Sequence, residues 1–321
     1  MTDYVLTFGK QGEEVFSLSL AKLVWIVILS LLVIAGIAVA IVFLYRRFGS
    51  AVKKGTRSGT SDSEMNGAAS ELEISIGKLH AQGKRTSQQD SFFVSSVEML
   101  PALGLLAVVG DGMGGLADGD RVSQTAVSAM ADHFYNMKGE PTLLLLALLE
   151  QANRAVNNLL GPSGRNKSGS TLVAGLAKEG KFYYTSVGDS RICLYRKGIL
   201  YQLNREHIFR NDLLLQSVNA DKTFQASVED KSGAGLTSFL GMGKLKYVDI
   251  PARPVDILPG DRFILMSDGV YNALSDDELK SYLDKTPEDA AQCIGAAIES
   301  KGYKSQDNYT AVILGCECKG E

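Results

Sequence analysis

The feature that most constrains this chain is an apolar run without a single charge, residues 23–44, which reads LVWIVILSLLVIAGIAVAIVFL. A helix over this run would be about 33 Å long at 1.5 Å per residue, which is enough to cross a lipid bilayer. Unbroken apolarity argues against a core helix, and the length and the polar lead argue against a cleaved signal peptide. We therefore expect one retained transmembrane helix over residues 23–45.

Basic residues after the run set its orientation. Arg46, Arg47, Lys53, Lys54 and Arg57 all follow it closely, and the positive-inside rule places that side of the helix in the cytoplasm. We therefore expect a single-pass protein of the plasma membrane, with its N-terminus outside and its catalytic part in the cytoplasm.

The expected organisation has four parts. A short extracytoplasmic segment covers residues 1–22 and precedes the transmembrane helix. Small and polar residues without apolar periodicity then indicate a flexible juxtamembrane linker over residues 46–70. The folded domain is expected over residues 71–321.

Composition excludes some classes of function. The formal net charge of -3, from 33 basic and 36 acidic residues, provides no global positive field for nucleic acid, so no nucleic-acid partner is expected. The four cysteines are too scattered for a zinc ribbon or a disulfide framework. An anionic substrate would have to be bound by a local site.

The pattern after residue 71 indicates mixed secondary structure. Short β-branched or aromatic runs, bounded by glycine or polar turns, are typical of strands, and gaps such as KEGK favour antiparallel pairing. Helical spacing marks residues 120–137 and 141–161, and two N-cap candidates, Ser275 and Thr286, open another pair of helices. The expected fold class is α+β, with antiparallel sheets covered by helices.

Four aspartates stand next to predicted strands. Asp111 and Asp268 follow strands, whereas Asp90 and Asp307 precede them. In antiparallel sheets these ends are neighbours, so the four carboxylates can meet at one edge. Each aspartate alone is better explained as a turn or cap residue. Together they need a counter-charge, and a site of oxygen ligands favours Mg²⁺ or Mn²⁺.

The sequence GDGMGG around Asp111 supports the metal interpretation. We expect a glycine-rich turn in which Gly112 offers its carbonyl, while Gly114 and Gly115 leave room for a substrate. A phosphate-binding P-loop would need a GK[ST] ending, and a dinucleotide fingerprint would need its third glycine one position later. The sequence matches neither.

Seven motifs occur in order after residue 82: GKRTSQQD, VVGDGMGG, SGSTLVAGL, VGDSRICLYRKG, SFLGMG, PGDRFILMSDGVYNALSDDEL and QDNYTAVIL. Their order and spacing resemble the metal-dependent protein phosphatases, the PPM or type-2C family, over residues 74–318. The resemblance implies an antiparallel β-sandwich flanked by paired helices, in four layers α-β-β-α. It also implies hydrolysis of phosphoserine and phosphothreonine in proteins by water activated by two Mn²⁺ or Mg²⁺ ions.

The resemblance assigns roles to individual residues. Asp111 would bridge both metals and Gly112 would give its carbonyl to one of them. Asp268 and Asp307 would complete the other metal site. Asp90 matches an acid on the water shell of the metals.

Other positions match the family in part. Arg85 matches the arginine that grips the substrate phosphate, a task that its bidentate fork suits. Asp189 matches an acid that helps to hold a third metal in some relatives, but the partner acid is Asn272 here, which makes a third metal weaker. Met113 stands where some members carry a histidine, and residues 207–238 fall where relatives carry a mobile flap.

The sequence therefore predicts a membrane-anchored serine/threonine protein phosphatase that acts on phosphorylated proteins and is opposed by a serine/threonine kinase. The alternative is a catalytically silent phosphoprotein-binding signalling module with the same fold. Loss of a metal aspartate would indicate such a module, and all four are present. A membrane sensor gated by the outer segment is disfavoured because that segment is so short.

Overall fold

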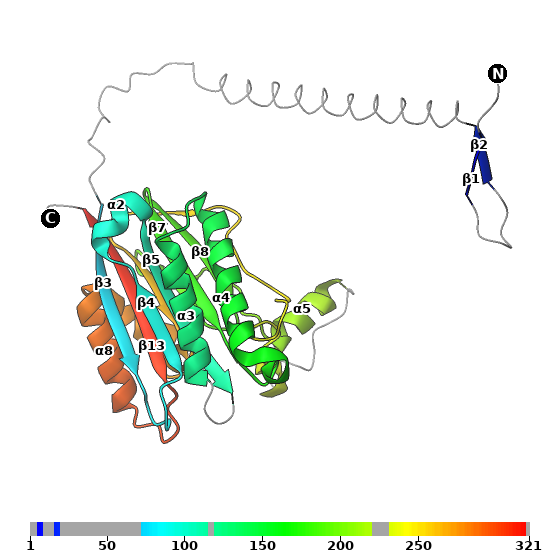
Figure 1. Cartoon of the computed structure of the whole chain (residues 1–321). Helices are drawn as coiled ribbons and strands as arrows, with labels where there is room; N and C mark the ends of the chain where they lie inside the picture. The colour runs from blue at the N-terminus through cyan, green and yellow to red at the C-terminus, as the bar shows by residue number, and fades with distance from the viewer. Residues whose placement is uncertain (1–4, 9–15, 20–71, 115–118, 220–230, 319–321) are drawn as a thin grey trace, which may run out of the picture. The chain divides into compact units, whose positions relative to one another are not determined.

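The computed structural model describes residues 5–8, 16–19, 72–114, 119–219 and 231–318, in two compact units, Met1–Ala68 and Ala69–Glu321 (Figure 1). In the first unit, β1 (Val5–Phe8) and β2 (Phe16–Ser19) pair antiparallel. The expected transmembrane helix and the linker over residues 46–70 lie outside the described residues. Among the helices that are described, none is long and apolar enough to cross a membrane.

The second unit contains two antiparallel sheets. The first sheet has the strand order β10-β9-β12-β13-β3. Its strands are β3 (Leu72–Ala81), β9 (Arg191–Arg196), β10 (Ile199–Gln202), β12 (Asp261–Met266) and β13 (Tyr309–Cys318).

The second sheet has the order β11-β8-β7-β5-β4, and β6 pairs with the end of β5. Its strands are β4 (Asp90–Val94), β5 (Leu105–Gly114), β6 (Ser168–Ser170), β7 (Leu172–Lys178), β8 (Lys181–Val187) and β11 (Val255–Asp256).

Helices cover the outer face of each sheet, with α3 and α4 on one side and α8 on the other (Figure 1). The α-helices of this unit are α2 (Leu100–Leu103), α3 (Gly119–Phe134), α4 (Pro141–Gly164), α5 (Phe209–Asn219), α6 (Asp268–Tyr271), α7 (Asp276–Leu283) and α8 (Pro287–Ser300). Two short 3₁₀ turns, η1 (Val97–Met99) and η2 (Lys231–Ala234), complete the described elements.

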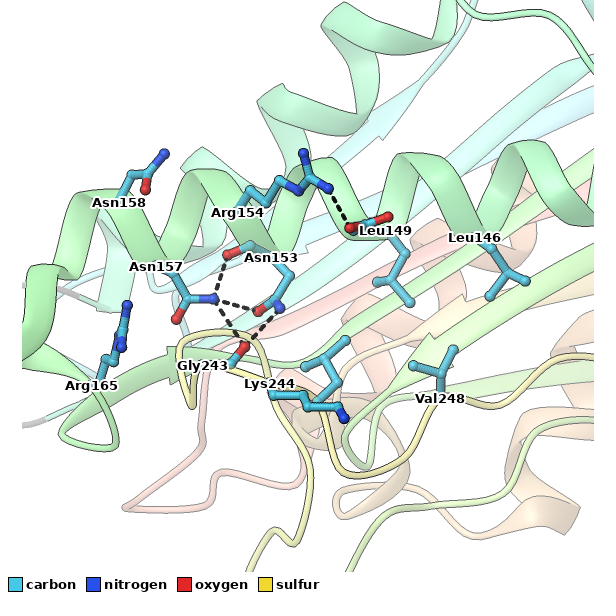
Figure 2. A pocket seen from close by; sticks show the side chains of 12 residues that line it. Leu146, Leu149, Asn153, Arg154, Asn157, Asn158, Arg165, Gly243, Lys244 and Val248 are labelled. Atoms are coloured by element: carbon cyan, nitrogen blue, oxygen red, sulfur yellow. Dashed lines mark hydrogen bonds and ion pairs between the residues drawn. The ribbon is translucent and has the colours of Figure 1, made fainter. Parts of the chain in front are cut away.

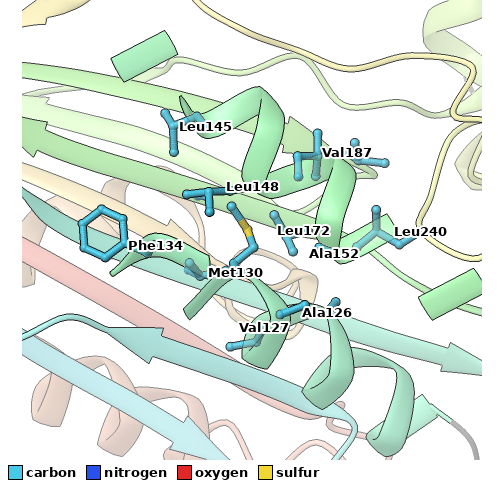
Figure 3. Packing of buried hydrophobic residues seen from close by; sticks show 14 of the residues in the cluster. Ala126, Val127, Met130, Phe134, Leu145, Leu148, Ala152, Leu172, Val187 and Leu240 are labelled. Carbon is cyan, nitrogen blue, oxygen red and sulfur yellow. The ribbon is translucent and has the colours of Figure 1, made fainter. Parts of the chain in front are cut away.

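Alternation along the strands builds three apolar layers between these elements. On β5, Leu106 and Val108 pack under α3 and α4, whereas Leu105 and Val109 face the other sheet. Figure 3 shows the helix layer, in which Met130 and Phe134 of α3 lie near Leu145 and Leu148 of α4. Because both faces of each central strand are covered, β7 is apolar up to Lys178 and β12 is apolar over residues 263–266.

The expected helix starts are confirmed at two positions. The Ser275 hydroxyl accepts a hydrogen bond from the backbone N–H of Glu278, and the Glu278 carboxylate accepts one from the Ser275 N–H, which forms a capping box at α7. Thr286 likewise accepts from the N–H of Asp289 at the start of α8. These caps fix the helix pair beside β12 and β13.

One local expectation was wrong. The stretch around Asp111 is not a turn, because β5 continues to Gly114 and pairs there with β6. Further along, Lys197 and Gly198 adopt φ values of 51° and 79° and reverse the chain in a hairpin between β9 and β10.

Candidate active site

Four aspartates lie at one end of the sandwich, two from each sheet. Asp90 opens β4 and is the direct cross-strand partner of Asp111 on β5. In the other sheet, Asp268 begins α6 just after β12, and Asp307 lies just before β13. Because β12 and β13 are antiparallel neighbours, the end of one lies beside the start of the other.

A pocket of about 260 Å³ occupies this end of the sandwich. Most of the residues predicted from the sequence line it, whereas Asp90 is buried behind the wall and is only 4% exposed. The lining residues are Arg85, Gln89, Asp111, Gly112, Met113, Thr171, Asp189, Leu236, Asp268, Asp307 and Asn308.

Three of the four acids have a hydrogen-bond donor beside them. Arg85 Nη2 lies 2.5 Å from Asp307 Oδ2. The Ser267 hydroxyl donates to Asp90 Oδ2 at 2.7 Å, and the Asn272 amide donates to Asp268 Oδ2 at 3.2 Å.

Within the described parts of the chain, no three carboxylate, histidine or cysteine side chains converge as a ready-made metal cage. Asp111, Asp268 and Asp307 line the pocket together, and Asp90 lies behind its wall.

The electrostatics of the pocket favour a bound cation. Burial, reinforced by the charges of Asp90 and Asp268, raises the pKa of Asp111 well above its ordinary value. Burial also raises the pKa of Asp90 to about 7, and that of Asp189 to about 7. The pKa of Asp268 is raised by burial and then by the charge of Asp307. Carboxyl groups gathered in one buried pocket resist ionisation unless positive charge lies beside them, and their oxygens suit a hard divalent cation.

Gly112 occupies a position that only glycine fits. Its backbone N–H donates to the Gln89 carbonyl at 3.0 Å. A Cβ atom added at Gly112 would lie 2.0 Å from the Gly119 carbonyl oxygen and 2.6 Å from that of Gln89. Three backbone segments thus approach one another here, which leaves a cradle with backbone oxygens beside Asp111.

Sequence reasoning missed residues that hold the acids in place. The Asn308 amide donates to the carbonyls of Gln82 at 2.7 Å and Ser87 at 3.0 Å, and its oxygen accepts from the Gln89 N–H at 2.8 Å. Asn308 therefore fixes the loop of Arg85 against Asp307. The sequence feature that could have revealed Asn308 is the QDN motif at residues 306–308, in which only Asp307 received a role.

Asp189, which the resemblance linked to a possible third metal, lies on the wall of the acidic pocket. Asp189 lies in the turn between β8 and β9, where its backbone carbonyl accepts a hydrogen bond from the Tyr271 hydroxyl at 3.2 Å. The Arg191 guanidinium stacks on the Tyr271 ring at 3.7 Å. Asn272, which stands at the partner position, presents its amide to Asp268. The partner position therefore holds an amide, and the acid whose charge acts most strongly on Asp189 is Asp268.

None of the histidines lines the pocket among the residues that the structure describes. His80 Nδ1 lies 2.9 Å from Thr310 Oγ1, and His133 Nδ1 lies 2.8 Å from the Ala129 carbonyl. His207 Nδ1 accepts from the Gly188 N–H at 3.2 Å, and burial lowers its pKa to about 4. All three are held by structural contacts.

A series of hydrogen bonds connects α4 to the acidic pocket. Figure 2 shows Asn153 and Asn157 of α4 beside Gly243, and both amides donate to its carbonyl, at 2.9 and 3.1 Å. In the same segment, Leu240 exchanges two backbone hydrogen bonds with Ser170 of β6, at 3.0 and 2.9 Å. Ser170 in turn pairs with Gly112. The helix therefore braces the strand that carries the glycine cradle.

Comparison with known proteins identifies the family. The model of the family described as protein phosphatase 2C matches residues 76–300, well over half of the chain. The chain belongs to the protein phosphatase 2C family. It is a metal-dependent serine/threonine protein phosphatase, and its α+β fold with two antiparallel sheets is that of the family.

Individual relatives agree with this assignment. The serine/threonine phosphatase stp of Listeria monocytogenes is 26% identical over 221 residues, which are 65% of this chain and 83% of that protein. The solved PPM Ser-Thr phosphatase MsPP from Mycobacterium smegmatis, in complex with cacodylate, is 26% identical with a TM-score of 0.61, covering 75% of this chain and 97% of that one. The catalytic domain of PstP in complex with two manganese ions is 24% identical, with a TM-score of 0.60, covering 77% and 99%.

Proposed function

We propose that this phosphatase hydrolyses phosphoserine and phosphothreonine with two divalent cations held in the acidic pocket. The observation that carries the proposal is the gathering of Asp111, Asp268 and Asp307, with the Gly112 cradle, around one pocket whose mouth holds Arg85. The PstP catalytic domain with two manganese ions supports the number and the kind of metal.

The donor chemistry fits these cations. Asp111 would serve both metals, with the Gly112 carbonyl, Asp268 and Asp307 as further oxygen ligands and Asp90 behind them. When bound, such ions lower the pKa of a coordinated water and neutralise the phosphoryl oxygens during in-line attack. A third ion at Asp189 would be held more weakly than these two, because Asn272 stands where the partner acid would be.

Arg85 would bind the phosphate. Its side chain is 56% exposed at the rim of the pocket, and its guanidinium contacts Asp307. A phosphate that enters beside Asp307 can accept two parallel hydrogen bonds from this planar group. Arg85 would thus orient the substrate, while the loop that carries it is fixed by Asn308.

The test is hydrolysis of a phosphothreonine peptide by residues 69–321, the compact unit, with Mn²⁺, with Mg²⁺ and with a chelator. We expect turnover that requires metal and that falls at least about a hundredfold in Asp268→Asn. Asp277→Asn is the matched control, because Asp277 is exposed on α7 and pairs only with Lys280 in the described region. Metal binding without turnover would instead favour the silent phosphoprotein-binding module.

We also propose that residues 23–45 anchor the enzyme in the plasma membrane, with the catalytic unit in the cytoplasm. The uncharged run and the basic residues after it support this arrangement. Phosphorylated proteins would be the substrates, and a serine/threonine kinase would supply them. The full chain should remain in the membrane fraction after alkaline carbonate extraction, whereas residues 69–321 should not. Recovery of the full chain in the soluble fraction would contradict the anchor.

A further inference from the structure

A second cavity, of about 410 Å³, adjoins the acidic pocket. Asp307 lines both, and Gly269 and Asn272, just after Asp268, form one wall of the second cavity. The other wall is the loop of residues 303–306 between α8 and β13. Because one extended residue spans only about 3.3 Å, a peptide whose phosphate lies beside Arg85 brings its neighbouring residues to this cavity.

The loop that forms this wall is held at both ends. The Gln306 amide donates to the Gly269 carbonyl at 3.0 Å, and the Gln306 carbonyl accepts from the Lys84 N–H at 2.8 Å. Before the loop, Lys301 forms an ion pair with Glu278 of α7. The wall is therefore a fixed part of the domain that is tied to both Asp268 and the loop of Arg85.

The cavity carries one unmatched charge. Among the described residues that line it, the single acid is Asp307, which already contacts Arg85 at 2.5 Å. Its only cation is Lys304, which is exposed and has no carboxylate partner among the described residues. A ligand that enters the cavity thus meets a net positive group that is free to pair.

We propose that this cavity is a subsite for an acidic residue next to the phosphorylated residue, with Lys304 as its specificity determinant. The proposal rests on the proposed function, because it places the reacting phosphate beside Arg85. It names a substrate class for the enzyme: phosphoserine or phosphothreonine flanked by aspartate or glutamate. An exposed lysine can pair with such a carboxylate without a large desolvation cost.

The experiment compares phosphothreonine peptides that carry alanine at every flanking position with peptides that carry one aspartate at each position in turn. With the full chain in detergent and at low salt, kcat/KM should rise about two- to five-fold for aspartate at one or two adjacent positions. Added salt should reduce this preference. Lys304→Gln should abolish it, and Lys304→Glu should shift it toward peptides with lysine at the same positions.

Lys244→Gln is the matched control. Lys244 is also exposed and without a carboxylate partner among the described residues, but it lies on the separate pocket at α4 (Figure 2), so this variant should keep the preference. Equal aspartate preference in the parent and in Lys304→Gln would overturn the subsite, as would no preference at any position. In either of these two outcomes the all-alanine peptide is still hydrolysed at the normal rate, so only the subsite is overturned. Loss of turnover of every peptide would overturn the proposed function as well.

Discussion

Asp90 and Asp111 are direct cross-strand partners on β4 and β5, which places two carboxyl groups on one face at the end of the sheet. Like charges opposite each other destabilise a sheet, and here burial raises the pKa of both groups. The pairing is therefore a feature that folding alone does not favour. A cation bound at this position would offset the repulsion, so we expect metal binding to raise stability.

Asp111→Asn should uncouple stability from metal. In the parent domain, Mn²⁺ at a hundred times its Kd should stabilise the folded state by about 2.7 kcal/mol, because it binds only that state. The variant should show little of this gain and should lose at least about a hundredfold in turnover. Thermal unfolding with Mn²⁺ and with chelator measures the difference. Equal stabilisation of parent and variant would remove Asp111 from the metal site.

Gly112→Ala should damage activity more than its single methyl group suggests. The added Cβ would lie 2.0 Å from the Gly119 carbonyl, so the start of α3 or the end of β5 must shift. We expect a loss of stability of about 1–3 kcal/mol and a loss in turnover of about a hundredfold. Gly139→Ala is the control, since a Cβ there has no neighbour within 4 Å. Peptide turnover and chemical denaturation would be measured on both, and parent-like activity of Gly112→Ala would contradict the cradle.

The layers of this fold were predictable because they depend on local patterns. Short apolar runs bounded by glycine or polar turns marked strands such as β5, and the N-cap candidate Ser275 marked the start of α7. The helix α5 was not predicted. Its surface leaves Leu214 47% exposed and Val218 70% exposed, so its sequence carries little of the amphipathic spacing that reveals a helix.

For the acidic pocket, the sequence predicts which strand ends come together but not the detailed contacts of each carboxylate. Strand polarity brings Asp111 and Asp268 to one end of the sandwich, but polarity does not say which neighbour holds each carboxylate. The contacts of Asp90 with Ser267 and of Asp307 with Arg85 join residues 177 and 222 positions apart. Such pairings depend on the packing of the two sheets, which one sequence does not encode in any local signal.

The asparagine clamp at α4 should matter for both stability and catalysis. Asn153→Ala with Asn157→Ala would leave the Gly243 carbonyl without either of its amide donors, at a cost of about 1–3 kcal/mol. Turnover should fall as well, because the segment pairs through Leu240 and Ser170 with the strand that carries Gly112.

Asn158→Ala provides the control for this clamp. Asn158 lies on the same helix (Figure 2) but is exposed and has no hydrogen-bond partner among the described residues. Urea denaturation and peptide hydrolysis would be compared for the two variants. A double variant that lost stability but kept full turnover would limit the clamp to a structural role.

His207 should make the stability of the domain depend on pH below neutrality. Burial lowers its pKa to about 4, with Arg205 acting in the same direction and Asp212 opposing it. Between about pH 6.5 and 4 the unfolded chain therefore binds more protons at this position than the folded domain does. The free energy of unfolding consequently rises with pH in that window, and the contribution of His207 is lost as the pH falls through it. In His207→Gln the amide oxygen can still accept from the Gly188 N–H, so this variant should show a smaller loss between pH 6.5 and 4. Denaturation of both proteins across that range, with chelator present, measures the difference, and parallel curves would show that His207 does not titrate on unfolding.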